Sequence, residues 1–256
     1  MARTKDPHAA TVKAWETRRR PLQGTGSTPT QIRKDFYEDT LGWEGARKFE
    51  DRRGIEGGSH TILGASHRDV VEIAGLDLSH EQLADLAGAP PGSQVEIEVR
   101  LGGGWPDSAV GVHTTFPGGA GESYRIIDGL IIHNQDMGVS SRMQGKGIGT
   151  AVLATQVETA SRLGFKEIRV IAAGGPSRRG STNGYYTWAL LGFESERRRP
   201  GPDNGRPESV QTIMRRPGGP AWWKENGESF FGRFDLSPGS TSMRVFEEYQ
   251  RLKGLR

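Results

Sequence analysis

The sequence predicts an α/β protein, because strand-like and helix-like segments alternate through its central part. Residues 95–101 and 109–116 are short runs in which β-branched side chains recur, as is typical of strands. Residues 151–163 place apolar side chains at helical spacing, and residues 165–172 alternate apolar and polar side chains as a half-buried strand does. Strands on both sides of a helix predict a layered α/β arrangement.

The N-terminal residues are strongly basic. Residues 1–20 carry six lysines and arginines against two acidic residues, a net charge of +4, whereas the whole chain has only +3. Residues 21–29 are rich in turn-forming side chains, so we expect a flexible basic arm over residues 1–29. Such an arm either binds nucleic acid through its positive charge or is a solvated terminus.

Residues 30–94 carry signals of two helices and of short strands. Apolar residues at helical spacing predict a helix over residues 30–50. Short β-rich runs predict strands at residues 61–63 and 70–73. Ser79 followed three residues later by Gln82 is a capping box, which predicts that a second helix begins there.

Further strands follow in the second half of the chain. Residues 124–139 predict a strand pair broken at Asp128–Gly129, a dipeptide typical of hairpins. Residues 210–214 predict a closing strand, and residues 241–253 a final helix. The last segment holds several large aromatic side chains, which we expect to pack on the core or to form a homodimer interface: Trp222, Trp223, Phe230, Phe231 and Phe234.

A glycine-rich run lies immediately before the helix expected at residues 151–163. Gly145, Gly147 and Gly149 lack side chains that would keep an anion away from the backbone. Backbone N–H groups at the start of a helix can then converge on a phosphate, and Arg142 and Lys146 add positive charge beside them. We call residues 141–149 the glycine loop and predict that it binds phosphate.

The spacing within the glycine loop distinguishes between known phosphate-binding patterns. It matches neither a Walker loop nor the dinucleotide-binding pattern, because Thr150 stands where the latter needs its third glycine. It does match Gln-x-x-Gly-x-Gly, from Gln144 to Gly149. Together with Leu191-Gly192-Phe193 about 40 residues later, these residues resemble the GNAT superfamily of acyl-CoA-dependent N-acetyltransferases.

The resemblance implies an architecture and a cosubstrate. The expected fold is a mixed central sheet flanked by helices, with the acetyltransferase core at residues 95–216. Residues 30–94 would then be a helical extension and acceptor-side cap, and residues 217–256 a C-terminal extension that packs on the core. The implied cosubstrate is acetyl-CoA, and the acceptor is an amine that no motif identifies.

The resemblance also implies roles for individual residues. Backbone N–H groups near Met137 and Val139 would polarise the thioester carbonyl. Trp188 stands where the family has the tyrosine that protonates the departing thiolate, and an indole is not a useful acid near neutral pH. Tyr185, Tyr186 or water is then the expected acid, unless both tyrosines only pack. The residues expected at the cosubstrate are Met137, Val139, Arg142, Gln144, Gly145, Lys146, Gly147, Gly149 and Thr150.

Two side chains near the end of residues 124–139 are candidates for the general base. His133 is favoured over Asp136 because an unperturbed histidine has a pKa near 6.5, which suits proton removal near neutrality. The two residues lie three apart, so in a regular strand they are expected on opposite faces of the sheet. A structural histidine, with ordered water as the base, is the alternative.

Composition and motif searches exclude several classes of protein. The six histidines show no metal-ligand spacing and there is no cysteine, so we expect no metal and no disulfide. The absence of cysteine, of an apolar run near 18 residues long and of a signal peptide predicts a soluble cytoplasmic protein without a membrane partner.

Two other functions remain open at this point. Arg178–Arg179 and Arg197–Arg199, with the basic arm, would suit a protein directed to nucleic acid, with or without catalysis. A structural or interaction protein with a vestigial acetyltransferase core is the third possibility.

Overall fold

The computed structural model describes residues 55–56, 60–101, 108–176, 182–203 and 205–254. Their strands are β1 (Ile55–Glu56), β2 (Thr61–Gly64), β3 (Gln94–Leu101), β4 (Ser108–Thr115), β5 (Gly121–Asp128), β6 (Ile131–Val139), β7 (Glu167–Ala172), β8 (Glu194–Ser195), β9 (Arg199–Pro200), β10 (Pro207–Glu208) and β11 (Phe230–Asp235). Their helices are α3 (His67–Ala74), α4 (His80–Leu86), α5 (Ile148–Arg162), α6 (Gly184–Leu190), α7 (Val210–Met214), α8 (Gly219–Asn226) and α9 (Thr241–Leu252), with a short 3-10 turn at Pro117–Gly119.

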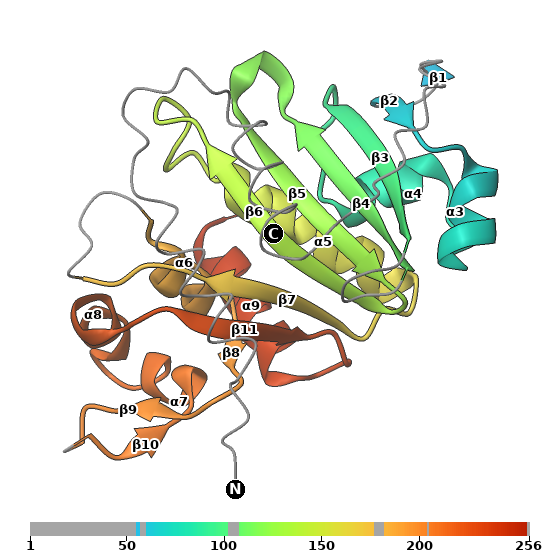
Figure 1. Cartoon of the computed structure of the whole chain (residues 1–256). Coiled ribbons are helices and arrows are strands. Elements are labelled where there is room, and N and C mark those ends of the chain that lie inside the picture. Colours follow the sequence, from blue (N-terminus) through green and yellow to red (C-terminus); the bar gives the residue numbers. More distant parts are fainter. Residues whose placement is uncertain (1–54, 57–59, 102–107, 177–181, 204, 255–256) are drawn as a thin grey trace, which may run out of the picture.

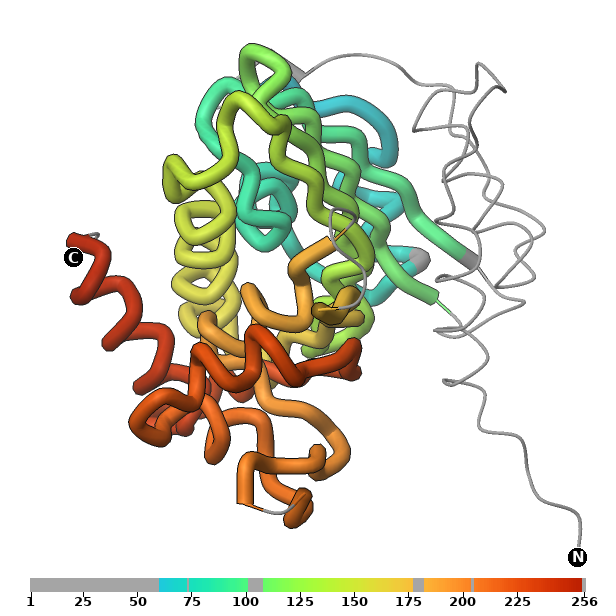
Figure 2. The backbone as a smooth tube through the Cα atoms, turned by 90° about the vertical axis from the view of Figure 1, so that its left-hand side faces the viewer, coloured from blue at the N-terminus to red at the C-terminus, as the bar shows by residue number. Residues whose placement is uncertain are grey.

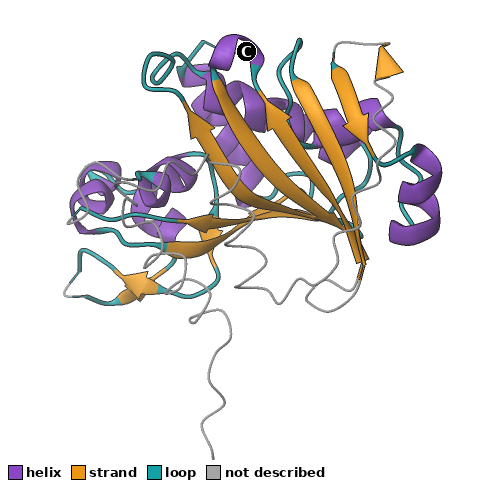
Figure 3. Ribbon diagram, turned by 45° about the horizontal axis from the view of Figure 1, so that its top comes forward, coloured by secondary structure: helices purple, strands orange, loops and turns teal. Residues whose placement is uncertain are grey.

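Within the described residues, nine of the strands form one mixed sheet in the order β1-β2-β3-β4-β5-β6-β7-β11-β8. The pairs β2–β3 and β6–β7 are parallel, and the other pairs are antiparallel. Figure 1 labels the strands, and Figure 3 shows the sheet as one curved layer with helices behind its central strands. The expected α/β class, with a mixed central sheet flanked by helices, is confirmed.

The core lies between the sheet and the helices that cover one of its faces. Helix α5 runs along this face, as Figure 2 shows, and packs beside α4. Leu83 and Leu86 of α4 and Leu153 and Val157 of α5 are buried in the same hydrophobic cluster as Val112 of β4. Because successive side chains of a strand alternate between faces, the opposite face of the sheet receives the intervening side chains.

Two segments expected to be strands are helices instead. Residues 70–73 lie in α3, which begins with a capping box between Ser66 and Asp69 and ends at Gly75 in the left-handed conformation. These local hydrogen bonds outweigh the weak strand preference of a β-branched run. Residues 210–214 form α7, whose first turn is capped by the Ser209 side chain. The expected strands there were therefore wrong.

Other expected elements are confirmed. The Ser79 capping box begins α4. The break at Asp128–Gly129 is the hairpin between β5 and β6, with Gly129 at a φ of 52°. The expected helix over residues 30–50 and the basic arm over residues 1–29 lie outside the described residues.

The C-terminal segment contributes a strand to the sheet. Strand β11 pairs with β7 on one side and with β8 on the other. The ring of Phe234 lies 5.3 Å from that of Phe193 and 5.9 Å from that of Phe246, measured between centroids. These three rings, Phe230 and Trp223 are buried, whereas Trp222 and Phe231 are only partly buried. The proposed division of the chain at residue 217 thus separates β11 from strands with which it pairs.

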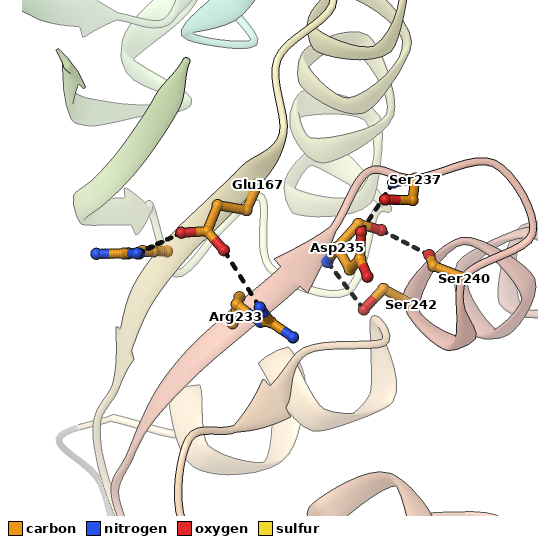
Figure 4. Close-up of polar contacts among 7 residues, drawn as sticks. Glu167, Arg233, Asp235, Ser237, Ser240 and Ser242 are labelled. Carbon is orange, nitrogen blue, oxygen red and sulfur yellow. Dashed lines mark hydrogen bonds and ion pairs between the residues drawn. The ribbon is translucent and has the colours of Figure 1, made fainter. Parts of the chain in front are cut away.

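Polar contacts hold the ends of β7 and β11 (Figure 4). Glu167 accepts a hydrogen bond from Arg169 at 2.7 Å and lies 3.6 Å from Arg233 on the neighbouring strand. At the turn into α9, Ser240 donates to the Asp235 carbonyl at 2.6 Å, and the Asp235 N–H donates to Ser242 at 3.1 Å. These contacts fix where β11 stops and α9 begins.

Gly192, between α6 and β8, offers a test of this packing. It has a φ of +94°, and a Cβ added there would lie 2.7 Å from the Ser242 carbonyl oxygen. Gly218 has a φ of +74° with nothing within 4 Å of such a Cβ. We expect Gly218→Ala to cost about 1 to 2 kcal/mol of unfolding free energy through backbone strain alone. Gly192→Ala should cost more, and equal losses in chemical denaturation would contradict the close approach of α9.

Candidate functional site

The sheet opens between β6 and β7. The two strands run parallel but pair only from Ile131 opposite Glu167 to Asn134 opposite Val170. Beyond Asn134, β6 continues to Val139 with β5 as its partner, while β7 continues with β11. Figure 1 shows the two strands diverging. Among the described residues no strand pairs with this edge of β6, so its backbone groups are placed to meet a ligand.

A β-bulge lies where the opening begins. Arg125 of β5 pairs with Asn134, but Tyr124 pairs with Asp136, which leaves Gln135 as an extra residue in β6. A bulge bends its strand and increases the local twist. It therefore turns β6 away from β7 while its pairing with β5 continues.

The bulge also places both candidate bases on one face of the sheet. His133 is opposite Ile126, and Asp136 is opposite Tyr124. Ile126 and Tyr124 are two residues apart in β5, so their side chains share a face, and cross-strand partners lie on the same face as each other. The expectation that His133 and Asp136 face opposite sides was wrong, because Gln135 shifts the alternation by one residue.

His133 is buried next to a positive charge. The residue is only 5% exposed, and its cross-strand partner in β7 is Arg169. Burial, and after it the charge of Arg169, lowers the pKa of His133 to about 4. The imidazole is therefore neutral near pH 7, and it is a weaker base than an unperturbed histidine.

A second group of polar side chains lies on the same face, across the sheet from Asp136. The Tyr124 ring stacks on His113 with centroids 4.0 Å apart, and its hydroxyl donates to Glu98 at 2.8 Å. Arg100 also donates to Glu98, at 2.8 Å. Burial alone would raise the pKa of Glu98, but the hydrogen bond from His113 and the charge of Arg100 hold it at about 2. No sequence motif indicated this group, because its members come from three strands.

The glycine loop continues directly from the end of β6. Gln144 donates its side-chain amide to the Val139 carbonyl at 3.1 Å, and the Met143 N–H donates to the Ser140 carbonyl at 2.8 Å. A Cβ added at Gly149 would lie 3.2 Å from the Met137 methyl group. The loop thus brings the last residues of β6 and the start of α5 together.

The glycine loop leaves the N-terminus of α5 open. Gly147 is the N-cap, with a φ of 80°, and no side chain caps the helix. The first intrahelical bond is from Ala151 to Gly147, so three preceding N–H groups have no acceptor within the helix. A Cβ at Gly145 or Gly147 would meet nothing within 4 Å. Arg142 and Lys146 are exposed beside this open cradle, which fits a phosphate.

The aromatic side chains of α6 have distinct surroundings. Trp188 is 8% exposed and makes an edge contact with Phe193, so it belongs to the core. The Tyr185 hydroxyl donates to the Lys224 carbonyl at 2.6 Å, and burial raises the pKa of Tyr185. Tyr186 is half-buried, with the Lys224 ammonium 5.8 Å from its ring centroid. The Tyr185 hydroxyl is therefore engaged by a backbone carbonyl, and the Tyr186 hydroxyl does not share this hydrogen bond.

The two arginine clusters noted in the sequence are only partly within the described residues. Arg178–Arg179 lie outside the described residues. Within Arg197–Arg199, Arg199 donates to Glu228 at 2.7 Å, so part of this charge is neutralised. The described residues contain no group of three or more histidine, aspartate or glutamate side chains that could hold a metal ion. None of the described helices is long and apolar enough to cross a membrane.

Comparison with known proteins gives structural similarities only. No family model and no curated protein matches the chain. The ribosomal-protein-S18-alanine N-acetyltransferase from Escherichia coli is 14% identical, with a TM-score of 0.32, over 52% of this chain and 72% of that one. Nourseothricin acetyltransferase is 12% identical, with a TM-score of 0.31, over 62% and 95%.

A third solved structure is similar to the same degree. It is described as an acetyltransferase of the GNAT family from Desulfovibrio desulfuricans and is 18% identical, with a TM-score of 0.30, over 50% of this chain and 70% of that one. Identities of 12% to 18% with TM-scores near 0.3 establish no function for this chain. The chain has a mixed α/β fold, and the solved structures to which it is similar are acetyltransferases.

Proposed function

We propose that this chain is an N-acetyltransferase of the GNAT type, which moves an acetyl group from acetyl-CoA to an amine. One observation carries the proposal: strand β6 leaves its neighbour β7 and then runs directly into the glycine loop and the uncapped start of α5. A backbone edge suited to a carbonyl group and a cradle suited to phosphate are therefore parts of one continuous segment.

The residues of the glycine loop fit the pyrophosphate of acetyl-CoA. The free N–H groups at the start of α5 would bind its oxygens, and the open space at Gly145 and Gly147 admits them close to the backbone. Arg142 and Lys146 would neutralise charge, and Thr150 adds a hydroxyl in the first helical turn. When bound, acetyl-CoA supplies a thioester, which is an activated acyl donor.

The end of β6 would stabilise the developing negative charge on the acyl oxygen. Backbone N–H groups between Met137 and Val139 lie on the part of β6 that has left β7. Backbone donors held in a folded strand need little reorganisation during the reaction, which is why such groups stabilise oxyanions well.

Asp136 is the better candidate for the base that takes the proton from the amine. It lies beyond the bulge, within the open part of β6, and it is only half-buried. His133 lies before the bulge, where β6 is still paired with β7, and its lowered pKa makes it a poor place for a proton. Tyr186 is the corresponding candidate for the acid that protonates the departing thiolate.

The first prediction tests the phosphate cradle with two substitutions of nearly equal size. Asparagine and aspartate both tolerate a positive φ, so Gly147→Asn and Gly147→Asp should strain the backbone alike. Only aspartate adds a negative charge where phosphate should lie, and we expect it to weaken acetyl-CoA binding by at least about 100-fold relative to asparagine. Calorimetry measures both affinities, and equal affinities would contradict the assignment of the loop.

The second prediction concerns the base. With labelled acetyl-CoA and cell extract separated into protein, RNA and small molecules, the fraction that gains label supplies the acceptor. We expect Asp136→Asn to lower turnover on that fraction by about 100-fold to 10,000-fold, the usual effect of losing a general base. His133→Gln should have a much smaller effect and should keep the acidic limb of the pH profile.

The pH profile also shows which outcome would reverse the assignment. If His133 were the base, activity would fall as pH drops through its pKa of about 4, because protonation removes the lone pair that accepts the proton. His133→Gln would then abolish that limb. Loss of the limb in His133→Gln, but not in Asp136→Asn, would assign the role to His133.

The third prediction compares the two tyrosines of α6. Tyr186→Phe should lower turnover by about 100-fold, with little change in acetyl-CoA affinity, because a general acid acts in the transition state. Tyr185→Phe should leave turnover nearly unchanged and cost about 1 kcal/mol of stability, since it loses the bond to the Lys224 carbonyl. Parental turnover in both variants would mean that the thiolate leaves without a tyrosine acid.

A further inference from the structure

Two buried polar side chains border the bulge on the face covered by helices. Asn134 and Arg125 are cross-strand partners immediately before Gln135, and they are 4% and 1% exposed. Asn134 reaches Gln156 in the middle of α5, with a hydrogen bond of 2.9 Å. The bulge therefore lies next to buried polar side chains between the sheet and α5.

Arg125 holds the first residues beyond the bulge. Its Nη1 donates to the Asp136 carbonyl at 2.6 Å and to the Tyr124 carbonyl at 3.1 Å. Asp136 and Tyr124 are the cross-strand pair in which the register resumes. Burying a charged group costs free energy that an apolar side chain of similar volume would not. A guanidinium at this place therefore does more than fill space.

The peptide group between Asp136 and Met137 connects the Arg125 contact to the opening between β6 and β7. The Asp136 carbonyl and the Met137 N–H belong to the same trans peptide, so they point in opposite directions. A carbonyl directed at Arg125 aims the Met137 N–H away from Arg125. Because β7 does not pair with β6 beyond Asn134, no strand partner takes up that side of the backbone within the described residues.

We propose that Arg125 is a positioning residue for acetyl transfer, which fixes the Asp136–Met137 peptide so that the Met137 N–H points into the opening between β6 and β7. The inference rests on the proposed function. Arg125 acts through the backbone and does not touch the substrate. Its charge also polarises the peptide it binds, which makes the N–H on the other side a stronger donor.

Gln156 provides a matched control. Its amide exchanges hydrogen bonds with Asn134 at 2.9 and 3.0 Å and donates to the Leu86 carbonyl at 2.7 Å. It is as buried as Arg125 and supports the same strand, but none of these bonds involves the Asp136–Met137 peptide. Replacing it loosens the same buried region without releasing that peptide.

Infrared spectroscopy of bound acetyl-CoA tests the proposal on the full chain. With a ¹³C label in the thioester carbonyl, a hydrogen bond from Met137 shifts the stretching frequency of the bound ligand below that of free acetyl-CoA. We expect the parent to show this shift and Arg125→Met to lose it, with unchanged calorimetric affinity for CoA itself. Gln156→Met should lose thermal stability and keep the parental shift.

The outcomes separate this inference from the proposed function. Arg125→Met with the parental shift overturns the role of Arg125. If Arg125→Met does not fold, Arg125→Lys decides, because it keeps the charge but lacks the fixed fork of donors. A reduced shift then supports the proposal, and an unchanged shift overturns it. A parent that binds acetyl-CoA without any shift overturns the role of Met137 and Arg125 alone, whereas a parent that binds no acetyl-CoA overturns the proposed function.

Discussion

The separation of β6 from β7 beyond Asn134 is the constraint on which the rest of the candidate site depends. A parallel pair that stayed hydrogen-bonded to its end would leave no backbone donors for a ligand and no space between the strands. The bulge at Gln135 lets β6 bend while its pairing with β5 continues to Val139, so the strand remains ordered where it stands apart. The glycine loop follows β6 directly, so the direction in which β6 leaves β7 also determines where α5 begins.

Burial and neighbouring charge decide which ionisable groups on this face hold protons. His133 is buried beside Arg169, so both its surroundings and its neighbour disfavour the charged form. Glu98 is half-buried, and although burial alone would raise its pKa, the hydrogen bond from His113, the charge of Arg100 and the Tyr124 hydroxyl favour its charged form. The same face therefore carries a neutral imidazole and an anchored carboxylate at neutral pH. Neither is well suited to exchange protons there, and this supports the proposal that Asp136, at the open end of β6, is the base.

The aromatic C-terminal segment supports the site although it lies far from the glycine loop in sequence. The Trp223 indole donates to the Tyr185 carbonyl at 3.0 Å, and the Tyr185 hydroxyl returns to the Lys224 carbonyl. These two bonds fix α6 against α8, while β11 holds the outer edge of β7. Residues that look like an appendage by composition thus determine where Tyr186 lies and where one wall of the opening runs.

The sequence by itself determined the elements whose signals are local. The capping box at Ser79, the hairpin between β5 and β6 and the glycine loop before α5 all depend on hydrogen bonds or backbone conformations within a few residues. A local signal was also overlooked, since the capping box before residues 70–73 makes them helical. Only the tertiary structure decided the bulge at Gln135, the shared face of the two candidate bases and the insertion of β11 into the sheet. Strand register and bulges depend on which strand lies alongside. When that strand is distant in sequence, the hydrophobic periodicity of one strand does not show how the two are paired.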